Sequence, residues 1–162
     1  MPPRPFFPTP GSTIVAQSYG SACPQLTGRS AFALTAVDEI SEDCLNLNIV
    51  RPRGGYPGKL PVMVYIYGGS FWVGQNRDDR TTPDGLILQS IANHHPVIHV
   101  SINYRLGIFG FATSESLRAK KSENEGMRDQ RLALEWVQDN IASFGGDPTK
   151  LTVFGQSSGG ER

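Results

Sequence analysis

Apolar residues gather along this chain into short runs separated by glycine, proline and polar residues. Three runs, at residues 45–50, 60–67 and 96–102, are rich in valine and isoleucine, which is typical of strands buried on both faces of a sheet. A fourth run, at residues 151–154, leads into a glycine-rich turn. We therefore predict four strands.

One stretch, between residues 126 and 148, has the spacing of an amphipathic helix. Its apolar residues recur at intervals of three and four, which places them on one face: Leu134, Val137, Ile141 and Phe144. Polar residues take other positions: Asp129, Glu135, Gln138 and Asp139. Gly145 and Gly146 end the helix, and Pro148 keeps it from resuming.

The order of these elements predicts an α/β fold. Strand, connection, strand, helix and strand follow one another, as in a mostly parallel sheet with flanking helices. In such sheets the reacting groups lie beyond the carboxyl ends of the strands. Two glycine-rich segments, at residues 67–70 and 155–159, would emerge together at this edge.

Composition narrows the possible functions. Fifteen basic residues balance fifteen acidic ones without long blocks of either sign, so the chain lacks the charge pattern of proteins that bind nucleic acid or membrane surfaces. No apolar stretch reaches the ~18 residues of a membrane span. The first ten residues hold five prolines and no signal-peptide core, and we expect residues 1–12 to be disordered. A start at an internal methionine, or a lost upstream exon, would look the same.

Metal and cofactor chemistry has little support. Cys23 and Cys44 are 21 positions apart, form no C-x-x-C pair and have no histidine cluster nearby, which disfavours zinc. A disulfide and two free thiols both remain open. Neither G-x-G-x-x-G nor G-x-x-x-x-G-K-[ST] occurs, which argues against a nucleotide-binding protein. We expect no metal and no cofactor.

The segment Gly155-Gln156-Ser157-Ser158-Gly159 fits the G-x-S-x-G pattern of a nucleophile elbow. A serine hydroxyl is a poor nucleophile at neutral pH, so an enzyme presents it in a strained turn beside a base, with N–H groups aimed at the oxyanion. The pattern alone also occurs in flexible loops. Its position after an apolar strand favours the catalytic interpretation.

A second glycine-rich segment, YGGSFWVG at residues 67–74, follows another predicted strand. Taken alone, it is better explained as a tight turn. With Ser157 in the same sheet, it becomes a candidate for the loop that supplies the oxyanion hole in α/β hydrolases.

Longer segments make the assignment specific. They are SEDCLNLNIVRP, VMVYIYGGSFWVG, VSINYRLGIFGF, NEGMRDQRLALEWVQDNIASFGGDP and FGGDPTKLTVFGQSSGG. In this order they resemble the type-B carboxylesterase family, which includes cholinesterases and fungal lipases. The resemblance runs from about Cys23 to Gly160. It implies that residues 1–162 are the N-terminal part of an α/β-hydrolase domain, truncated after the nucleophile elbow.

The family's site residues carry over to matching positions. Ser157 matches the nucleophile, and three residues match the N–H donors of the oxyanion hole: Gly69, Ser70 and Ser158. Two aromatic residues would line the substrate pocket: Phe71 and Trp72.

Three positions depart from the family's usual residues. Gln156 stands where glutamate is more frequent, and Ser158 stands where alanine is common. Both departures are mild, because position 158 contributes its backbone N–H. Ser70 replaces a frequent glycine; it keeps an N–H but would narrow the acyl pocket.

The resemblance also assigns roles away from the serine. Cys23 and Cys44 match a family disulfide, worth ~3 kcal/mol in an oxidising compartment, which fits a secreted protein or the secretory pathway. Arg105 and Asp129 match a structural ion pair; ordinary solvated charges are the weaker alternative. The loop between the cysteines contains no tryptophan, the residue that seats choline in cholinesterases. The expected partner is a small-molecule carboxylic ester other than a choline ester.

The catalytic triad is incomplete in this sequence. In α/β hydrolases the acid and the histidine follow the serine, but only five residues follow Ser157. His94 and His95 precede the third strand, roughly 20 Å or more from the serine at ~3.3 Å per residue. His99 lies inside that strand, and we expect it to pack beneath a helix. None of the three is expected to be the base.

These observations predict that the intact protein is a serine ester hydrolase and that this chain is a fragment without activity of its own. One alternative is a degraded gene product. Another is a non-catalytic, cholinesterase-like interaction protein, which would have no need of Ser157, Gly69 and Ser70. The identity of the ester and the oligomeric state stay open.

Overall fold

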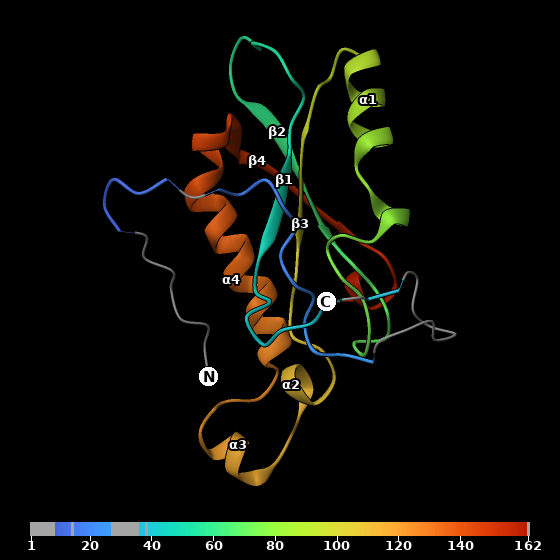
Figure 1. Cartoon of the computed structure of the whole chain (residues 1–162), viewed down its shortest axis with the longest axis vertical. Coiled ribbons are helices and arrows are strands. Elements are labelled where there is room, and N and C mark those ends of the chain that lie inside the picture. Colours follow the sequence, from blue (N-terminus) through green and yellow to red (C-terminus); the bar gives the residue numbers. More distant parts are fainter. Residues whose placement is uncertain (1–8, 14, 27–35, 38, 162) are drawn as a thin grey trace.

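The computed structural model describes residues 9–13, 15–26, 36–37 and 39–161. Within them lies a four-stranded sheet of order β1-β3-β2-β4 (Figure 1). Its strands are β1 (Leu47–Val50), β2 (Leu60–Ile66), β3 (Ile98–Ile102) and β4 (Gly146–Gly155). β2 is parallel to β3 and β4, whereas β1 is antiparallel to β3. The predicted α/β fold with a mostly parallel sheet is confirmed.

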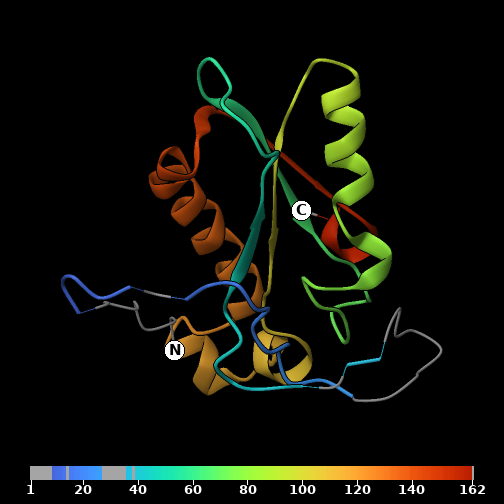
Figure 2. The same cartoon turned by 45° about the horizontal axis from the view of Figure 1, so that its top comes forward.

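Helices cover both faces of the sheet. α4 (Glu125–Asn140) lies on one side and α1 (Asp84–Ala92) on the other in both views (Figure 1 and Figure 2). Shorter elements lie in the connections: η1 (Asp79–Thr81), α2 (Gly107–Phe111), α3 (Glu115–Ala119), η2 (Ile141–Phe144) and η3 (Ser157–Gly159). The arrangement has three layers, with β2 and β3 in the middle of the sheet.

The core lies between the sheet and α4. Alternating side chains of β2 and β3 have no solvent exposure: Val62, Val64, Ile98, Val100 and Ile102. Val137 and Ile141 join them from the C-terminal half of α4 and from η2, as the helical spacing predicts. Each fully buried valine or isoleucine stabilises the fold by ~1.5–3 kcal/mol. This cluster fixes α4 against the two central strands.

The boundaries of β4 differ most from expectation. Expected at residues 151–154, this strand begins at Gly146, because it pairs with β2 from Leu60 to Ile66 across an irregularity in the register. Its first residues, glycine, aspartate and proline, carry no strand signal. The other three strands differ from expectation by one or two residues at one end.

The expected amphipathic helix is present, but its final turn is not α-helical. α4 ends at Asn140 and the chain continues as the tighter η2, which leaves Phe144 39% exposed beside Trp136. Phe144, which the spacing places on one face with Val137 and Ile141, is therefore not part of the core, because the tighter turn of η2 has nearer three residues per turn than 3.6. The pattern also fails to predict α1, in which Ile87 is the buried residue.

Several expectations concern the chain as a whole. Of the segment expected to be disordered, residues 1–8 lie outside the described part, and the Ser12 N–H donates to the Thr9 carbonyl at 3.0 Å in a turn. None of the helices in the described segments has the length and apolarity to cross a membrane. Nor do the described side chains bring together three potential metal ligands among His, Cys, Asp and Glu.

The two cysteines form a disulfide, which confirms the pairing that the family resemblance implies. Cys23 and Cys44 are bonded and fully buried. Next to the disulfide, Ala22 forms a parallel bridge with Ile40. The bond therefore joins two buried positions that are 21 residues apart in sequence.

Arg105 follows β3 and is anchored to α4 by two carboxylates. Its Nε donates to Asp129 Oδ2 at 2.7 Å, and its Nη2 donates to Asp129 Oδ1 at 2.6 Å and to Glu125 at 3.1 Å. The Asp129 side chain has no solvent exposure and that of Arg105 has 18%. Hydrogen bonding to Asp129 raises the pKa of Arg105. Arg105 and Asp129 are thus a buried ion pair rather than solvated charges.

We expect Asp129→Asn to lower the free energy of unfolding by about 3 kcal/mol, because it leaves a largely buried guanidinium without its closest counter-charge. Glu135→Gln is the matched control on the same helix. It breaks the Arg131–Glu135 pair, whose side chains are 82% and 54% exposed, and should cost less than ~0.5 kcal/mol. Urea unfolding followed by circular dichroism measures both changes. Equal losses would contradict the special role of the buried pair.

Candidate active site

Ser157 stands at a sharp turn where β4 ends. The strand stops at Gly155, Gln156 is still extended, and Ser157 opens the short η3 with a φ of 51°. This left-handed conformation costs a residue with a side chain roughly 1–2 kcal/mol. The G-x-S-x-G segment therefore forms the strained turn after a strand that its pattern predicts, with a single 3₁₀ turn following it.

Two glycines allow this elbow to lie directly against the end of β2. A Cβ atom at Gly155 would collide with the Gly159 carbonyl, and a Cβ atom at Gly159 would collide with the Ile66 carbonyl. The Gln156 N–H donates to that same Ile66 carbonyl at 3.4 Å. Bare backbone is needed at both positions because the two chain segments touch there.

The glycine-rich loop after β2 begins beside the serine. A Cβ atom at Gly68 would lie 3.0 Å from the Ser157 Cβ. The loop then turns back on itself, because the N–H groups of Trp72 and Val73 both donate to the Gly69 carbonyl, at 3.0 and 3.2 Å. The two glycine-rich segments thus meet at the carboxyl edge of the sheet.

Three consecutive residues of this loop have positive φ angles. They are 125° at Gly69, 56° at Ser70 and 63° at Phe71. Serine and phenylalanine rarely adopt this conformation, and such outliers concentrate at functional sites. The strain makes this loop a candidate site independently of its distance from Ser157.

Three backbone N–H groups of the glycine loop and the elbow donate no hydrogen bond within the described part of the chain. No residue in the described part of the chain accepts a hydrogen bond from the N–H of Gly69, Ser70 or Ser158. Ser158 is buried, Gly69 is half-buried and Ser70 is exposed. Unpaired donors beside a nucleophile are what an oxyanion hole requires. Their joint action on one oxyanion stays a prediction.

Comparisons with known proteins agree on one family. A model of the carboxylesterase family matches residues 1–162. The chain belongs to the carboxylesterase family. It is 56% identical over 161 residues to a secreted lipase of Arthroderma benhamiae, covering 98% of this chain and 28% of the lipase. It is 44% identical over 146 residues to the para-nitrobenzyl esterase of Bacillus subtilis, covering 90% and 28%.

Two further comparisons concern an inactive relative and a solved structure. An inactive carboxylesterase-like protein, VdtD of Byssochlamys spectabilis, is 47% identical over 98% of this chain and 27% of its own length. The solved structure of a thermophilic para-nitrobenzyl esterase matches with a TM-score of 0.75 and 41% identity over 88% of this chain and 28% of that one. The fold is therefore the N-terminal part of the α/β-hydrolase fold of these esterases. The chain spans less than a third of the length of these relatives.

The two aromatic residues expected in the substrate pocket belong to the glycine-rich loop itself and pack against the segment of α2. Phe71 packs against Phe111, with ring centroids 4.7 Å apart. Trp72 is 63% exposed and lies over Gly107, whose N–H donates to the Phe71 carbonyl at 2.7 Å. Contact between either residue and a substrate stays a prediction.

Sequence reasoning missed Gln25, which ties the disulfide segment to the end of the glycine loop. Its side-chain amide donates to the Gly74 carbonyl at 2.7 Å and accepts from the Gly74 N–H at 2.8 Å. The partners are 49 residues apart in sequence, so no local pattern could have indicated the contact.

Sequence reasoning also missed two tyrosines beneath the site. Tyr67, the first residue of the glycine-rich segment, stacks on Tyr104 with ring centroids 4.6 Å apart. Each phenol donates to the other's backbone carbonyl, from Tyr67 at 3.1 Å and from Tyr104 at 2.9 Å. Burial raises the pKa of Tyr104 to about 12 and that of Tyr67 well above its ordinary value. Both are therefore neutral hydrogen-bond donors at physiological pH.

None of the three histidines lies within hydrogen-bonding distance of Ser157, as the register of the strands indicates. Val153 of β4 is level with Val100 of β3, because both pair with Val64 of β2. His94 and His95 precede β3 at the amino end of the parallel strands, whereas Ser157 follows β4 at their carboxyl end, so the length of the strands, at about 3.3 Å per residue, lies between them. These residues belong to the opposite edge of the sheet.

His99 lies in the core rather than in the site. It is 3% exposed and lies on the face of the sheet opposite α4, beside the rings of Tyr65 and Phe154. Its Nδ1 has no hydrogen-bond partner in the described part of the chain. Burial lowers the pKa of His99 to about 4. It is a neutral core residue at physiological pH.

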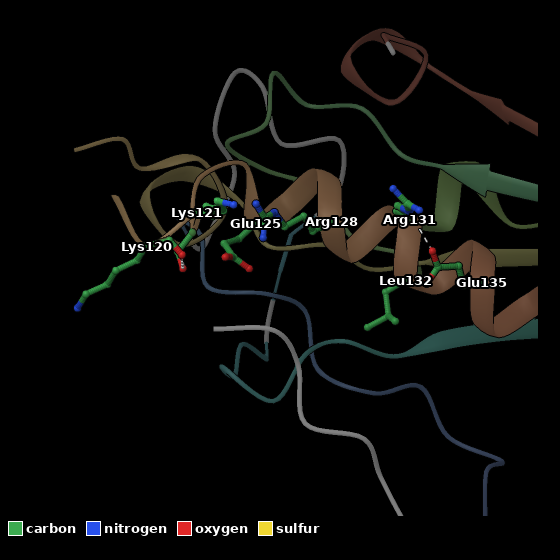
Figure 3. A pocket seen from close by; sticks show the side chains of 8 residues that line it. Lys120, Lys121, Glu125, Arg128, Arg131, Leu132 and Glu135 are labelled. Atoms are coloured by element: carbon green, nitrogen blue, oxygen red, sulfur yellow. Dashed lines mark hydrogen bonds and ion pairs between the residues drawn. The ribbon is translucent and has the colours of Figure 1, made fainter. Parts of the chain in front are cut away.

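A hollow of about 420 Å³ opens along α4 and the segment that precedes it (Figure 3). Most of its lining is charged: Lys120, Lys121, Ser122, Glu125, Arg128, Arg131, Leu132 and Glu135. Its two carboxylates already pair with arginines, Glu125 with Arg105 and Glu135 with Arg131. The hollow shares no residue with the serine turn or the glycine loop, and we interpret it as a solvated charged face.

We expect Gly68→Ala to destabilise the fold by about 2 kcal/mol or more, because its Cβ atom has no room beside the Gln156 carbonyl and the elbow must move. Gly85→Ala is the control. It lies in α1, where a Cβ atom meets nothing within 4 Å, and it should be neutral or stabilise by up to ~1 kcal/mol. Thermal unfolding of both variants tests the contrast. A neutral Gly68→Ala would show that the loop and the elbow do not touch as described.

We expect stability to fall as the pH is lowered from about 6.5 to about 4, because unfolding lets His99 take up a proton that its folded environment excludes. The contribution is fully present above pH 6.5 and is lost toward pH 4. His99→Gln should remove this part of the pH dependence, whereas His94→Gln, at an exposed position, should leave it. Melting temperatures across this range measure the effect. An unchanged profile in His99→Gln would refute it.

Proposed function

We propose that the protein carrying this chain hydrolyses carboxylic esters through an acyl-enzyme on Ser157. The observation that carries the proposal is the juxtaposition at the carboxyl edge of the sheet. There a strained serine lies beside a strained loop, and backbone N–H groups of both segments have no partner in the described residues. Family membership alone would not suffice, since one relative at 47% identity is named as inactive.

In the proposed reaction, Ser157 Oγ attacks the carbonyl carbon of the ester. The N–H groups of Gly69, Ser70 and Ser158 stabilise the negative charge that develops on the carbonyl oxygen. The alcohol leaves with a proton, and water then attacks the acyl-serine to release the acid and restore the hydroxyl. The pattern of donors supports acyl transfer rather than chemistry that needs a metal.

The general base comes from outside these 162 residues in this proposal. Catalysis of this kind needs a histidine and an orienting carboxylate, and the histidines of this chain are remote from the site or sealed in the core. The relatives are more than three times as long as the matched region, which leaves room for both groups. By itself, the 162-residue chain should have negligible esterase activity.

The substrate and compartment follow from the same features. The balanced charge of the chain and the free N–H donors favour an uncharged small-molecule ester. The buried Cys23–Cys44 disulfide favours an oxidising compartment. A secreted lipase at 56% identity supports a place in the secretory pathway. A non-catalytic interaction protein would not need the strained serine, so we favour the enzyme.

The test begins with the native transcript, read beyond the codon for Arg162. The longest frame should be expressed and assayed with p-nitrophenyl butyrate. We expect Ser157→Ala to lower kcat at least ~1,000-fold, because the nucleophile is lost while binding and the oxyanion hole remain. Ser116→Ala, at an exposed position in α3, is the control and should retain full activity.

Two results would contradict the proposal. One is a longest frame without ester hydrolysis, which would favour a non-catalytic or degraded product. The other is turnover by the 162-residue chain that depends on Ser157, which would show that the base lies within these residues after all.

A further inference from the structure

The Tyr67 carbonyl lies where the two halves of the proposed oxyanion hole meet. It accepts a hydrogen bond from the Tyr104 phenol at 2.9 Å. A Cβ atom at Gly159 would lie only 2.6 Å from the same oxygen, so the elbow packs directly onto it. Gly68, which contacts Ser157, is the next residue in the chain. The Tyr67 carbonyl, at the start of the loop, is therefore in contact with both the elbow and the Tyr104 phenol.

Ser158, which supplies the elbow's N–H to the proposed oxyanion hole, also lies close to Tyr104. Ser158 is 3% exposed, and its hydroxyl lies beside the Tyr104 phenol, where it opposes the rise in that phenol's pKa. Its Oγ has no hydrogen-bond partner within the described part of the chain. The phenol already uses its proton on the Tyr67 carbonyl, so its free lone pair is the acceptor available to the serine.

We propose that Tyr104 is a positioning residue for the oxyanion hole, with its phenol bridging the Tyr67 carbonyl and the Ser158 end of the elbow. The inference rests on the proposed function. Oxyanion donors act over a narrow range of distances, so a support that fixes the spacing between loop and elbow affects the transition state more than substrate binding. The water-free surroundings make this hydrogen bond stronger and more rigid than an exposed one.

The chain contains a closely matched comparison for this idea. Tyr104→Phe removes the hydroxyl that holds the Tyr67 carbonyl and faces Ser158. Tyr67→Phe removes the reciprocal hydroxyl, which donates to the Tyr104 carbonyl at 3.1 Å and accepts from the Tyr104 N–H at 3.4 Å. Both variants keep the stacked rings, but Tyr104→Phe loses one of these buried hydrogen bonds and Tyr67→Phe loses two. A purely structural role therefore predicts that Tyr67→Phe disturbs the site at least as much as Tyr104→Phe.

The first measurement uses the 162-residue chain and needs no activity. The amides of Gly159 and Gly160 donate to the Gln156 and Ser157 carbonyls at 2.9 and 2.7 Å, so their hydrogen exchange reports opening of the elbow. We expect Tyr104→Phe to speed this exchange at least ~10-fold more than Tyr67→Phe, relative to the central β3 amide of Val100 as the reference for global unfolding. Equal acceleration in both variants would overturn the proposal.

The second measurement uses the ester-hydrolysing form. We expect Tyr104→Phe to lower kcat about 10-fold with KM within about twofold, and Tyr67→Phe to keep most of the activity at a comparable melting temperature. If Ser157→Ala leaves turnover intact, the proposed function fails and the exchange measurement still decides the role of Tyr104. If Ser157 is essential but both tyrosine variants have the same kcat, the positioning role alone fails.

A further variant covers the case in which Tyr104→Phe does not fold. Ser158→Ala removes the other hydroxyl at the elbow and keeps the backbone N–H. We expect it to speed exchange at Gly159 and Gly160 about threefold, with no change at Val100. No change at the two elbow amides would count against the bridge.

Discussion

The close contact of bare backbone at the carboxyl ends of β2 and β4 is the constraint on which the proposed site depends. The two strands are parallel neighbours, and Ile66 pairs with Gly155 at their last shared position. Whatever follows these strands must therefore emerge side by side. Glycine at positions 68, 155 and 159 leaves no side chain to separate them. The fold thus brings together a loop and a turn that are about 90 residues apart in sequence.

The surroundings of this contact are held by pairs of residues that are distant in sequence. The disulfide segment reaches the glycine loop through Gln25 and Gly74. The end of β3 is held to α4 by Arg105 and Asp129. Each link is buried or nearly so, which makes it specific as well as stabilising. Strained residues such as Ser157 persist only when the surrounding structure determines their conformation, and these links provide that support.

In this arrangement, the residues that support the site differ from the groups that are proposed to act on the substrate. The supporting groups, among them the tyrosine pair beneath the loop, are buried or partly buried and hydrogen-bonded to one another. The groups proposed to act on substrate, namely the Ser157 hydroxyl and the N–H groups of Gly69, Ser70 and Ser158, have no hydrogen-bond partner in the described structure. Functional sites often combine hydrogen-bonded surroundings with central polar groups that have no hydrogen-bond partner. The inactive relative shows why the geometry of the centre deserves more weight than family membership.

Much of the architecture follows from the sequence, because hydrophobic runs and spacing report burial directly. The four strands, the amphipathic helix over Val137 and Ile141 and the strained turn at Ser157 all follow local patterns. The start of β4 and the exposure of Phe144 do not, since pairing with β2 and a tightened helical turn override local preference there. Helix α1 gave no signal because it buries so little.

The sequence by itself determined the family and the position of the proposed site, since short motifs mark the residues proposed as nucleophile and donors. The tertiary structure alone decided what surrounds them. Only folding brings Gln25 to Gly74, places the Tyr104 phenol on the Tyr67 carbonyl and buries His99 away from the serine. The physical reason is that these contacts join residues on different strands and loops, where the spacing along the chain carries no information about the distance in space.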